Sequence, residues 1–275
     1  MSEADFVMTD HPAWMPDRDG GGTLRVLGSV DGGRWLVRTG GPTAFVVEQL
    51  VPAMGKPAYD VFRLPPDALT ELPQLAQSLA GLGAVARFRA GNLWEALGTA
   101  AVRQMLQGAH GARLYREFCR AYGERIPLPT GEDYWLFPTA EAVLALSREQ
   151  FEAARLTSKR GVLRDAATSY LRHASVWQSL SPPRLIEHLR RIPGVGLWTA
   201  HAAAADWSND WAFYPSSDPT LRTWARRAAP DYPWPSEERA FTNFWRTLTR
   251  THLGPATVLT LAFGNRHGNP TEPHP

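Results

Sequence analysis

The chain has 275 residues, of which 44% are hydrophobic and 20% are charged, and its formal net charge at pH 7 is +2. This is the balance of a soluble globular protein that is long enough for one large or two modest domains. A single cysteine excludes an internal disulfide framework and a four-cysteine cluster, and with no long apolar run and no recognisable signal peptide we expect a cytoplasmic protein without membrane association.

The first 90 residues predict a leader and a small lobe. Residues 1–22 are rich in acidic residues, glycine and proline, and predict a flexible leader. Between residues 23 and 90, short β-branched runs alternate with glycine-rich turns, a pattern typical of strands. Residues 69–83 have helical spacing within this region. We therefore expect an α+β lobe over residues 23–90.

From Asn92 onward the helical period dominates, and residues 91–265 predict a helical domain. Thr139 is a suitable N-cap for a helix that continues to residue 154. Residues 266–275 are polar and proline-rich and predict a frayed tail. The expected fold class is therefore mainly α, with a small N-terminal α+β lobe and an active-site cleft between helical subdomains.

The segment RRIPGVGLWTA, from Arg190 to Ala200, ends one helix and starts the next. Pro193 cannot continue a helix, and Gly194 and Gly196 permit backbone angles that are closed to other residues. Two helices joined in this way predict a helix–hairpin–helix, whose bare glycines and free N–H groups favour a bound phosphate. A tight turn without a ligand is the alternative. Hairpin carbonyls often hold a monovalent cation; we expect no other cofactor.

The surroundings of the hairpin are basic. Residues 151–200 contain eight Lys or Arg against three Asp or Glu, although the whole chain is nearly neutral. Such a stretch favours a polyanionic partner, and a solvated arginine-rich helix face is the alternative. The eight histidines show no metal-ligand spacing with acidic residues, so no side-chain metal site is predicted.

Asp218 follows Trp198 by twenty residues, at the start of a helix that carries arginines. Alone it predicts a helix N-cap. The hairpin and the aspartate together resemble the helix–hairpin–helix (HhH-GPD) superfamily of DNA glycosylases, in which a catalytic aspartate follows the hairpin. Over roughly residues 90–265 the chain is similar to the bacterial 3-methyladenine DNA glycosylase II type, whose hairpin also reads P-G-h-G-x-W-T-A.

This resemblance implies a monomeric, bacterial, nucleoid-associated enzyme of base-excision repair that binds double-stranded DNA with a damaged base. It would flip out the base, in this branch an alkylated purine, and hydrolyse the N-glycosidic bond. Asp218 would stabilise the oxocarbenium ion that develops on the sugar. Related bifunctional enzymes carry a lysine where this chain has Trp198, so no AP-lyase activity is expected.

The resemblance also carries other residues into the site. WEALGTAAVRQM, TSKRGVLRDAA and LFPTAEAVLAL each resemble a segment of that branch. The base pocket would contain Trp198, Phe263 and His201. The wedge that fills the gap left by the base would be Gln104 and Met105, and the remaining DNA contacts would come from Lys159, Arg160, Pro193, Gly194, Val195, Gly196 and Thr199.

Three departures from the branch leave the substrate open. Ala202 and Pro219 stand where the branch has tyrosines, and the loop before Asp218 has one additional residue at Ser216–Ser217. With fewer aromatic walls the lesion could instead be uracil, hypoxanthine or an oxidised base. A non-catalytic DNA-damage-binding protein with the same hairpin is a further alternative, but it would not need the carboxylate.

Overall fold

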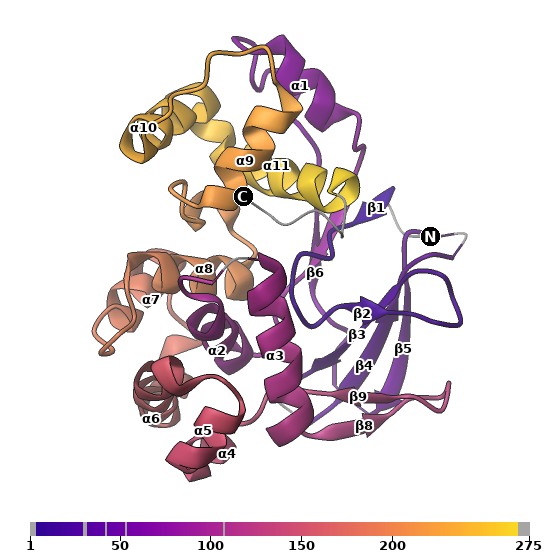
Figure 1. The fold of residues 1–275 in the computed structure, drawn as a ribbon. Helices are drawn as coiled ribbons and strands as arrows, with labels where there is room; N and C mark the ends of the chain where they lie inside the picture. Colours follow the sequence, from indigo (N-terminus) through magenta and orange to yellow (C-terminus); the bar gives the residue numbers. More distant parts are fainter. Residues whose placement is uncertain (1–3, 30–31, 42, 53, 107, 269–275) are drawn as a thin grey trace.

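The computed structural model has three groups of elements: the sheets of an N-terminal lobe and two groups of helices (Figure 1). This arrangement confirms the mainly α fold with a small β-containing lobe. Within the described part of the chain, no helix has the length and apolar content to cross a membrane. The structure describes residues 4–29, 32–41, 43–52, 54–106 and 108–268.

Two small sheets form the lobe. The first is antiparallel and contains, in spatial order, β2 (Met15–Pro16), β3 (Thr23–Gly28), β4 (Arg34–Arg38) and β5 (Val46–Val51). In the second, β7 (Val85–Phe88) lies between β1 (Phe6–Val7), which is parallel to it, and β6 (Tyr59–Phe62), which is antiparallel. β3 and β7 are almost entirely buried, as expected of strands whose two faces are both covered.

The prediction of a flexible leader over residues 1–22 is wrong for residues 4–22. β1 and β2 pair with strands of the two sheets, and Met8, His11 and Trp14 are buried. The run of three glycines belongs to a turn between β2 and β3, which the Asp17 N–H closes by donating to the Gly22 carbonyl. The apolar residues of this segment stand in two runs, Phe6–Met8 and Ala13–Met15, that are too short to show a strand period, so its composition was misleading.

The first helical group contains the expected hairpin. Thr139 caps its helix as predicted, with its side chain accepting from the Ala142 N–H. That helix is then interrupted, because Ser147 and Gln150 form a capping box that begins a new one. The group consists of α2 (Leu93–Arg103), α3 (Gly108–Tyr122), α4 (Ala140–Ala145), α5 (Arg148–Ala153), η1 (Thr157–Lys159), α6 (Arg160–Trp177), α7 (Pro182–Leu189) and α8 (Leu197–Ser208).

The second helical group lies at the other end of the molecule in Figure 1. It consists of α1 (Pro73–Ala80), η2 (Trp211–Phe213), α9 (Pro219–Ala228), α10 (Glu238–Thr249), η3 (Arg250–His252) and α11 (Leu253–His267). α11 continues beyond residue 265, so the predicted tail begins too early; residues 269–275 lie outside the described residues.

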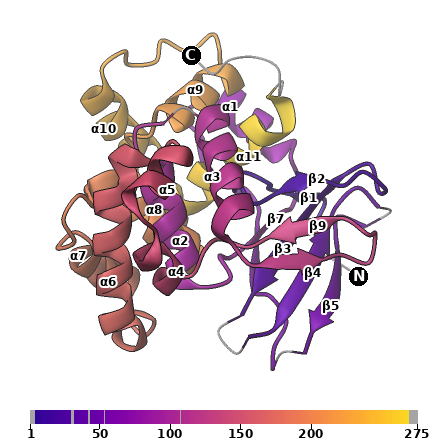
Figure 2. The ribbon, with the colours of Figure 1, turned by 60° about the horizontal axis from the view of Figure 1, so that its bottom comes forward.

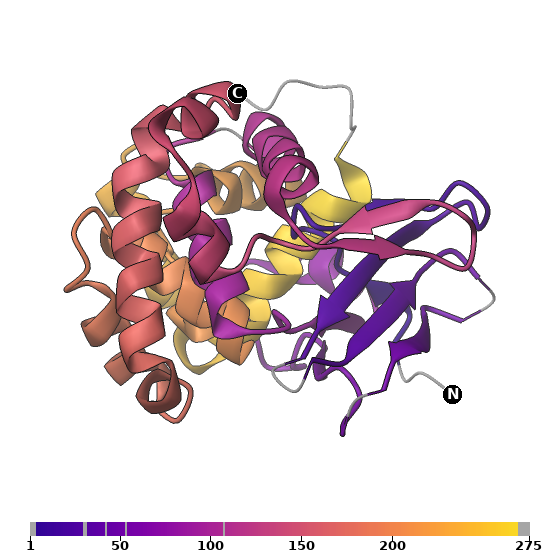
Figure 3. The same ribbon diagram turned by 90° about the horizontal axis from the view of Figure 1, so that it is seen from below.

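The boundary predicted near residue 90 does not separate two packing units. α1, which comes from the predicted lobe, packs against α9 and α11. Conversely, the hairpin of β8 (Arg125–Pro127) and β9 (Asp133–Trp135) lies across the lobe, as Figures 2 and 3 show. Its Ile126 and Tyr134 share a cluster with Leu24, Val26 and Leu36 of the sheet. Both α1 and the β8–β9 hairpin therefore pack against partners on the other side of the predicted boundary.

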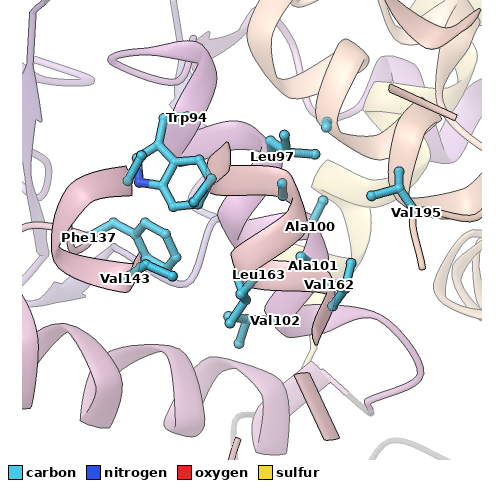
Figure 4. Packing of buried hydrophobic residues seen from close by; sticks show 14 of the residues in the cluster. Trp94, Leu97, Ala100, Ala101, Val102, Phe137, Val143, Val162, Leu163 and Val195 are labelled. Carbon is cyan, nitrogen blue, oxygen red and sulfur yellow. The ribbon is translucent and has the colours of Figure 1, made fainter. Parts of the chain in front are cut away.

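α8 lies between two apolar cores. One contains α2, α3, α6 and α7, and Figure 4 shows part of it, with Trp94 beside Phe137 and Val195 of the hairpin near Val162. The other contains α1, α9, α10 and α11. Ala202, in the middle of α8, packs against both cores. In the segment that leads from α8 to Asp218, Trp211 and Tyr214 belong to the second core and Phe213 packs against the first.

A buried ion pair ties the lobe to the first helical group. Arg25 of β3 donates from Nη2 to Oε1 of Glu95 in α2 over 2.8 Å, and the two side chains are only 1% and 10% exposed. The other carboxylate oxygen accepts from the Gly91 N–H. Neither charge has ready access to water, so each depends on the other for its compensation.

Candidate active site

The hairpin between α7 and α8 is anchored by its apolar residues and exposes its glycines. Ile192 and Val195 are buried, whereas Pro193, Gly194 and Gly196 are exposed. Gly194 has φ = +79°, in the left-handed region that favours glycine. A Cβ at this position would also lie 3.1 Å from Cβ of Val162. The turn therefore requires glycine at position 194, as the sequence predicts.

The N-terminus of α8 is open to an anion. Gly196 is its N-cap, in extended conformation and without a side-chain cap, and a Cβ there would meet nothing within 4 Å. Arg190 and Arg191 are exposed just before the turn. The uncapped N–H groups and the helix dipole make this end suitable for a phosphate. The Ile192 carbonyl accepts one hydrogen bond and keeps a second lone pair, so the turn also retains acceptors for a monovalent cation.

Two of the predicted hairpin contacts need correction. Thr199 is completely buried, so its side chain is wrongly assigned to DNA binding. Its hydroxyl has no hydrogen-bond partner among the described residues. Val195 faces the core, so only its backbone remains for a contact. The turn is too short to have a hydrophobic period, so the sequence does not show which of its residues are buried.

Asp218 is the helix N-cap that its position predicts, and it also accepts hydrogen bonds from two aromatic side chains. As N-cap of α9, its Oδ1 accepts from the N–H groups of Thr220 (2.7 Å) and Leu221 (3.3 Å). Its Oδ2 accepts from Nε1 of Trp198 (2.7 Å) and from the Tyr214 hydroxyl (3.1 Å). The residue is 4% exposed. Four donors therefore fix the orientation of a carboxylate at the junction of the two cores.

Trp198 and Tyr214 reach Asp218 from different elements. Trp198 is in the first turn of α8, and Tyr214 follows η2. Burial, and then the charge of Asp218, raise the pKa of Tyr214 well above its ordinary value, so its hydroxyl stays protonated and donates. Tyr214 was not predicted as a site residue. Its only signal in the sequence is an aromatic residue directly before Pro215.

His201 and Phe263 lie on the two helices that flank this junction. The Nδ1 of His201 donates to the Phe213 carbonyl over 2.7 Å, so the imidazole holds the loop that leads to Asp218. Burial lowers the pKa of this half-buried histidine. Phe263 of α11 is half-buried, and its ring centroid lies 4.5 Å from that of His267. Pro219 occupies the first position of α9, where its missing N–H costs nothing.

The predicted wedge is a sharp turn at the end of α2. Met105 is 95% exposed and has φ = +59°, so it projects from the turn in a conformation that few such residues adopt. The Lys159 ammonium donates to the backbone carbonyl of Gln104. Lys159 is only 8% exposed, and burial lowers its pKa. Contrary to the sequence-based expectation, Lys159 therefore supports the wedge turn and is not a free contact for DNA.

Arg160 lies beside Lys159, at the start of the next helix. Arg160 begins α6 and is half-buried. A cavity of about 370 Å³ lies beside Trp94 and Tyr170, and another of about 420 Å³ lies in the lobe. Asp218 lines neither of these two cavities. Among the described residues no group of three or more His, Cys, Asp or Glu could hold a metal ion.

No protein-family model matches the chain, and no curated protein matches it. Solved structures do. The 8-oxoguanine glycosylase/lyase of Clostridium acetobutylicum has a TM-score of 0.70 at 15% identity, over 95% of this chain and 90% of that one. The 3-methyladenine DNA-glycosylase of Archaeoglobus fulgidus has a TM-score of 0.62 at 16% identity, over 95% and 93%. The 3-methyladenine DNA glycosylase of Schizosaccharomyces pombe has a TM-score of 0.50 at 20% identity, over 62% of this chain and 79% of that one.

These structural neighbours are DNA glycosylases of the helix–hairpin–helix type. The first of them was crystallised with double-stranded DNA that contains 8-oxoguanine opposite cytosine. At such low identities the likeness establishes a shared fold. It covers nearly the whole chain in the Clostridium and Archaeoglobus structures, including the N-terminal lobe. The fold that the sequence resemblance implied is thereby confirmed.

Proposed function

We propose that this protein is a monofunctional DNA glycosylase that acts as a monomer, without a cofactor, on alkylated purines in double-stranded DNA. The observation that carries the proposal is the meeting of Trp198, from the hairpin, with Asp218 at the start of α9. A phosphate-binding hairpin alone would suit any DNA-binding protein. An oriented carboxylate next to it is what cleavage of an N-glycosidic bond requires.

Each part of the site has a task in this proposal. The hairpin and the exposed Arg190 and Arg191 hold the DNA backbone, independently of sequence. The flipped nucleotide leaves a gap in the duplex, and the projecting side chain of Met105 fills it. Flipping costs a few kcal/mol and is easiest for damaged or mispaired bases, which itself contributes to selection.

The hydrogen bonds of Asp218 favour an electrostatic role over that of a general base. Two donors occupy each of its oxygens, so no lone-pair position remains to take a proton from water. As the bond to the base breaks, positive charge develops on the sugar, and the carboxylate stabilises it. Water then adds to C1′ of the sugar and releases a proton to the solvent. An N-alkylated purine suits this mechanism because it already carries the positive charge that makes it a good leaving group.

Trp198 supports the same substrate class. Its indole hydrogen bond to Asp218 leaves the ring face for stacking, and an electron-rich face attracts a cationic base. Ala202, one turn further along α8, supplies no second aromatic wall. The Clostridium neighbour acts on 8-oxoguanine, so an oxidised base is the second candidate, with uracil and hypoxanthine behind it.

The lesion can be identified with a panel of duplexes. Each would carry one lesion (3-methyladenine analogue, 7-methylguanine, 8-oxoguanine, hypoxanthine or uracil), and the free base would be measured by chromatography. We expect release of the alkylated purines. Release of only another base would change the assigned substrate class but would still show glycosylase activity. Binding to lesion duplexes without any release would identify the non-catalytic alternative.

No covalent intermediate with DNA is expected. The chain has only two lysines. The ammonium of Lys159 is engaged with the Gln104 carbonyl, and the exposed Lys56 lies between β5 and β6 of the lobe. Borohydride treatment during the reaction should therefore trap no protein–DNA adduct, with the Clostridium glycosylase/lyase as positive control. An adduct that disappears in Lys159→Arg would instead assign a lyase step to Lys159.

Gly194→Ala should weaken binding to undamaged duplex DNA by about tenfold. The left-handed backbone disfavours alanine by about 1–2 kcal/mol, and its Cβ would press on Val162, so the turn shifts away from the phosphate. Fluorescence anisotropy at fixed salt measures the effect. Gly161→Ala is the control, because its Cβ meets nothing within 4 Å. Equal affinities of the two variants would contradict the assigned role of the hairpin.

A further inference from the structure

A stack of three side chains leads from the lobe to Asp218. The guanidinium carbon of Arg87, on β7, lies 4.4 Å from the ring centroid of Trp211. The Trp211 ring is stacked on that of Tyr214, with 4.8 Å between centroids and 30° between planes. The Tyr214 hydroxyl then donates to Oδ2 of Asp218. Side chains from the lobe, η2 and the following loop are thus aligned on one carboxylate oxygen.

The base of this stack is rigid. Arg87 is 2% exposed; it forms an ion pair with Asp206 at the end of α8, and its Nε lies 3.3 Å from the Asp10 carboxylate. Asn209 ties the stack together with one side chain. Its Oδ1 accepts from Arg87 Nη1 (3.0 Å) and Trp211 Nε1 (3.2 Å), and its Nδ2 donates to the Arg87 carbonyl (2.8 Å).

Tyr214 itself has little freedom. It is 8% exposed, its ring is clamped by Trp211, and its pKa keeps the hydroxyl protonated at all physiological pH values. A tyrosine has only two side-chain torsions to fix, so a buried ring presents its hydroxyl at a well-defined point. Trp198, by contrast, is half-exposed and is also the side chain that a flipped base would contact. Tyr214 is therefore the more firmly held of the two side-chain donors to Asp218.

We propose that Tyr214 is a positioning residue for Asp218, and that the Arg87–Trp211–Tyr214 stack makes the orientation of this carboxylate depend on the N-terminal lobe. The proposal rests on the proposed glycosylase function. It also gives the lobe a part in the reaction: through Arg87 it supports the loop from which Asp218 acts on the sugar.

Tyr214→Phe removes the hydroxyl and keeps the ring. Under single-turnover conditions we expect base release to slow by about tenfold, as for loss of one hydrogen bond to a charged group. Affinity for duplex DNA with an abasic-site analogue should stay unchanged, because the hairpin is untouched. Tyr134→Phe is the matched control: its hydroxyl is equally buried but donates to the Ala13 carbonyl over 2.8 Å.

A second measurement does not depend on activity. The indole N–H of Trp198 donates to the same oxygen as Tyr214, so its ¹H–¹⁵N resonance should move in Tyr214→Phe and stay in Tyr134→Phe. A rate within twofold of wild type, or an unmoved resonance, would overturn the positioning role. If the wild-type protein releases no base but the Trp198 resonance moves in Tyr214→Phe, the proposed function is wrong. The positioning of Asp218 by Tyr214 is then still supported.

Discussion

Asp218→Asn is expected to slow base release by at least about a thousandfold. The substitution removes the negative charge that faces the developing oxocarbenium ion, and loss of a single preorganised electrostatic contact in such sites already costs about 10²–10³ in rate. The fold should survive, because asparagine is as good an N-cap as aspartate and can still accept from the Thr220 and Leu221 N–H groups. Single-turnover release from the best duplex of the panel measures the effect.

Affinity separates this loss of chemistry from a loss of binding. The Kd of Asp218→Asn for lesion duplex should remain within about threefold of wild type, because the phosphate contacts lie in the hairpin. Asp210→Asn is the matched control: Asp210 also caps a helical turn, through the Ala212 N–H, but is exposed and does not contact Trp198. Base release by Asp218→Asn at more than a tenth of the wild-type rate would contradict the assignment.

Glu95→Gln is expected to destabilise the folded protein by about 3–5 kcal/mol. The glutamine has nearly the same shape but leaves the charge of Arg25 buried and uncompensated, which is the costly way to break an internal ion pair. The free energy of unfolding from urea titration measures the change. A shift of the midpoint without a change of slope would show that stability itself has changed.

An exposed pair on α7 provides the comparison for Glu95. Glu187 pairs with Arg184 over 3.0 Å, but both side chains are more than half exposed. Glu187→Gln should therefore unfold at the same urea concentration as wild type. Replacing both buried partners, as Arg25→Met with Glu95→Leu, should recover most of the loss, since no lone charge remains. If Glu95→Gln is as stable as Glu187→Gln, the ion pair does not tie the lobe to α2.

The elements of the site that depend on local chain chemistry could be predicted from the sequence. A proline and two glycines dictate the turn of the hairpin, and the structure places Gly194 at a positive φ that favours glycine. Asp218 lies directly before a proline that begins a helix, so its N-cap role follows from the sequence. The hydrogen bond between Trp198 and Asp218 did not follow from it; the family resemblance brought the two residues together.

The rest depends on contacts between distant residues, which one sequence does not display. Tyr214 belongs to no recognisable sequence motif. Its proposed role depends on Trp211, which stacks on its ring and is itself covered by Arg87. The family resemblance implies a DNA contact for Lys159, but the turn after α2 brings the Gln104 carbonyl to its ammonium. The segment over residues 4–22 was interpreted from composition as a leader, but strand pairing with β7 and β3 buries it.

Chemically methylated DNA tests the central claim most directly. Genomic DNA treated with a methylating agent would be incubated with catalytic amounts of the wild-type protein and, separately, of Asp218→Asn, and the released bases identified by mass spectrometry. The account predicts free 3-methyladenine or 7-methylguanine with the wild-type protein, and only spontaneous release with the variant. Equal release by the two proteins, or none by either while both bind the DNA, would contradict it.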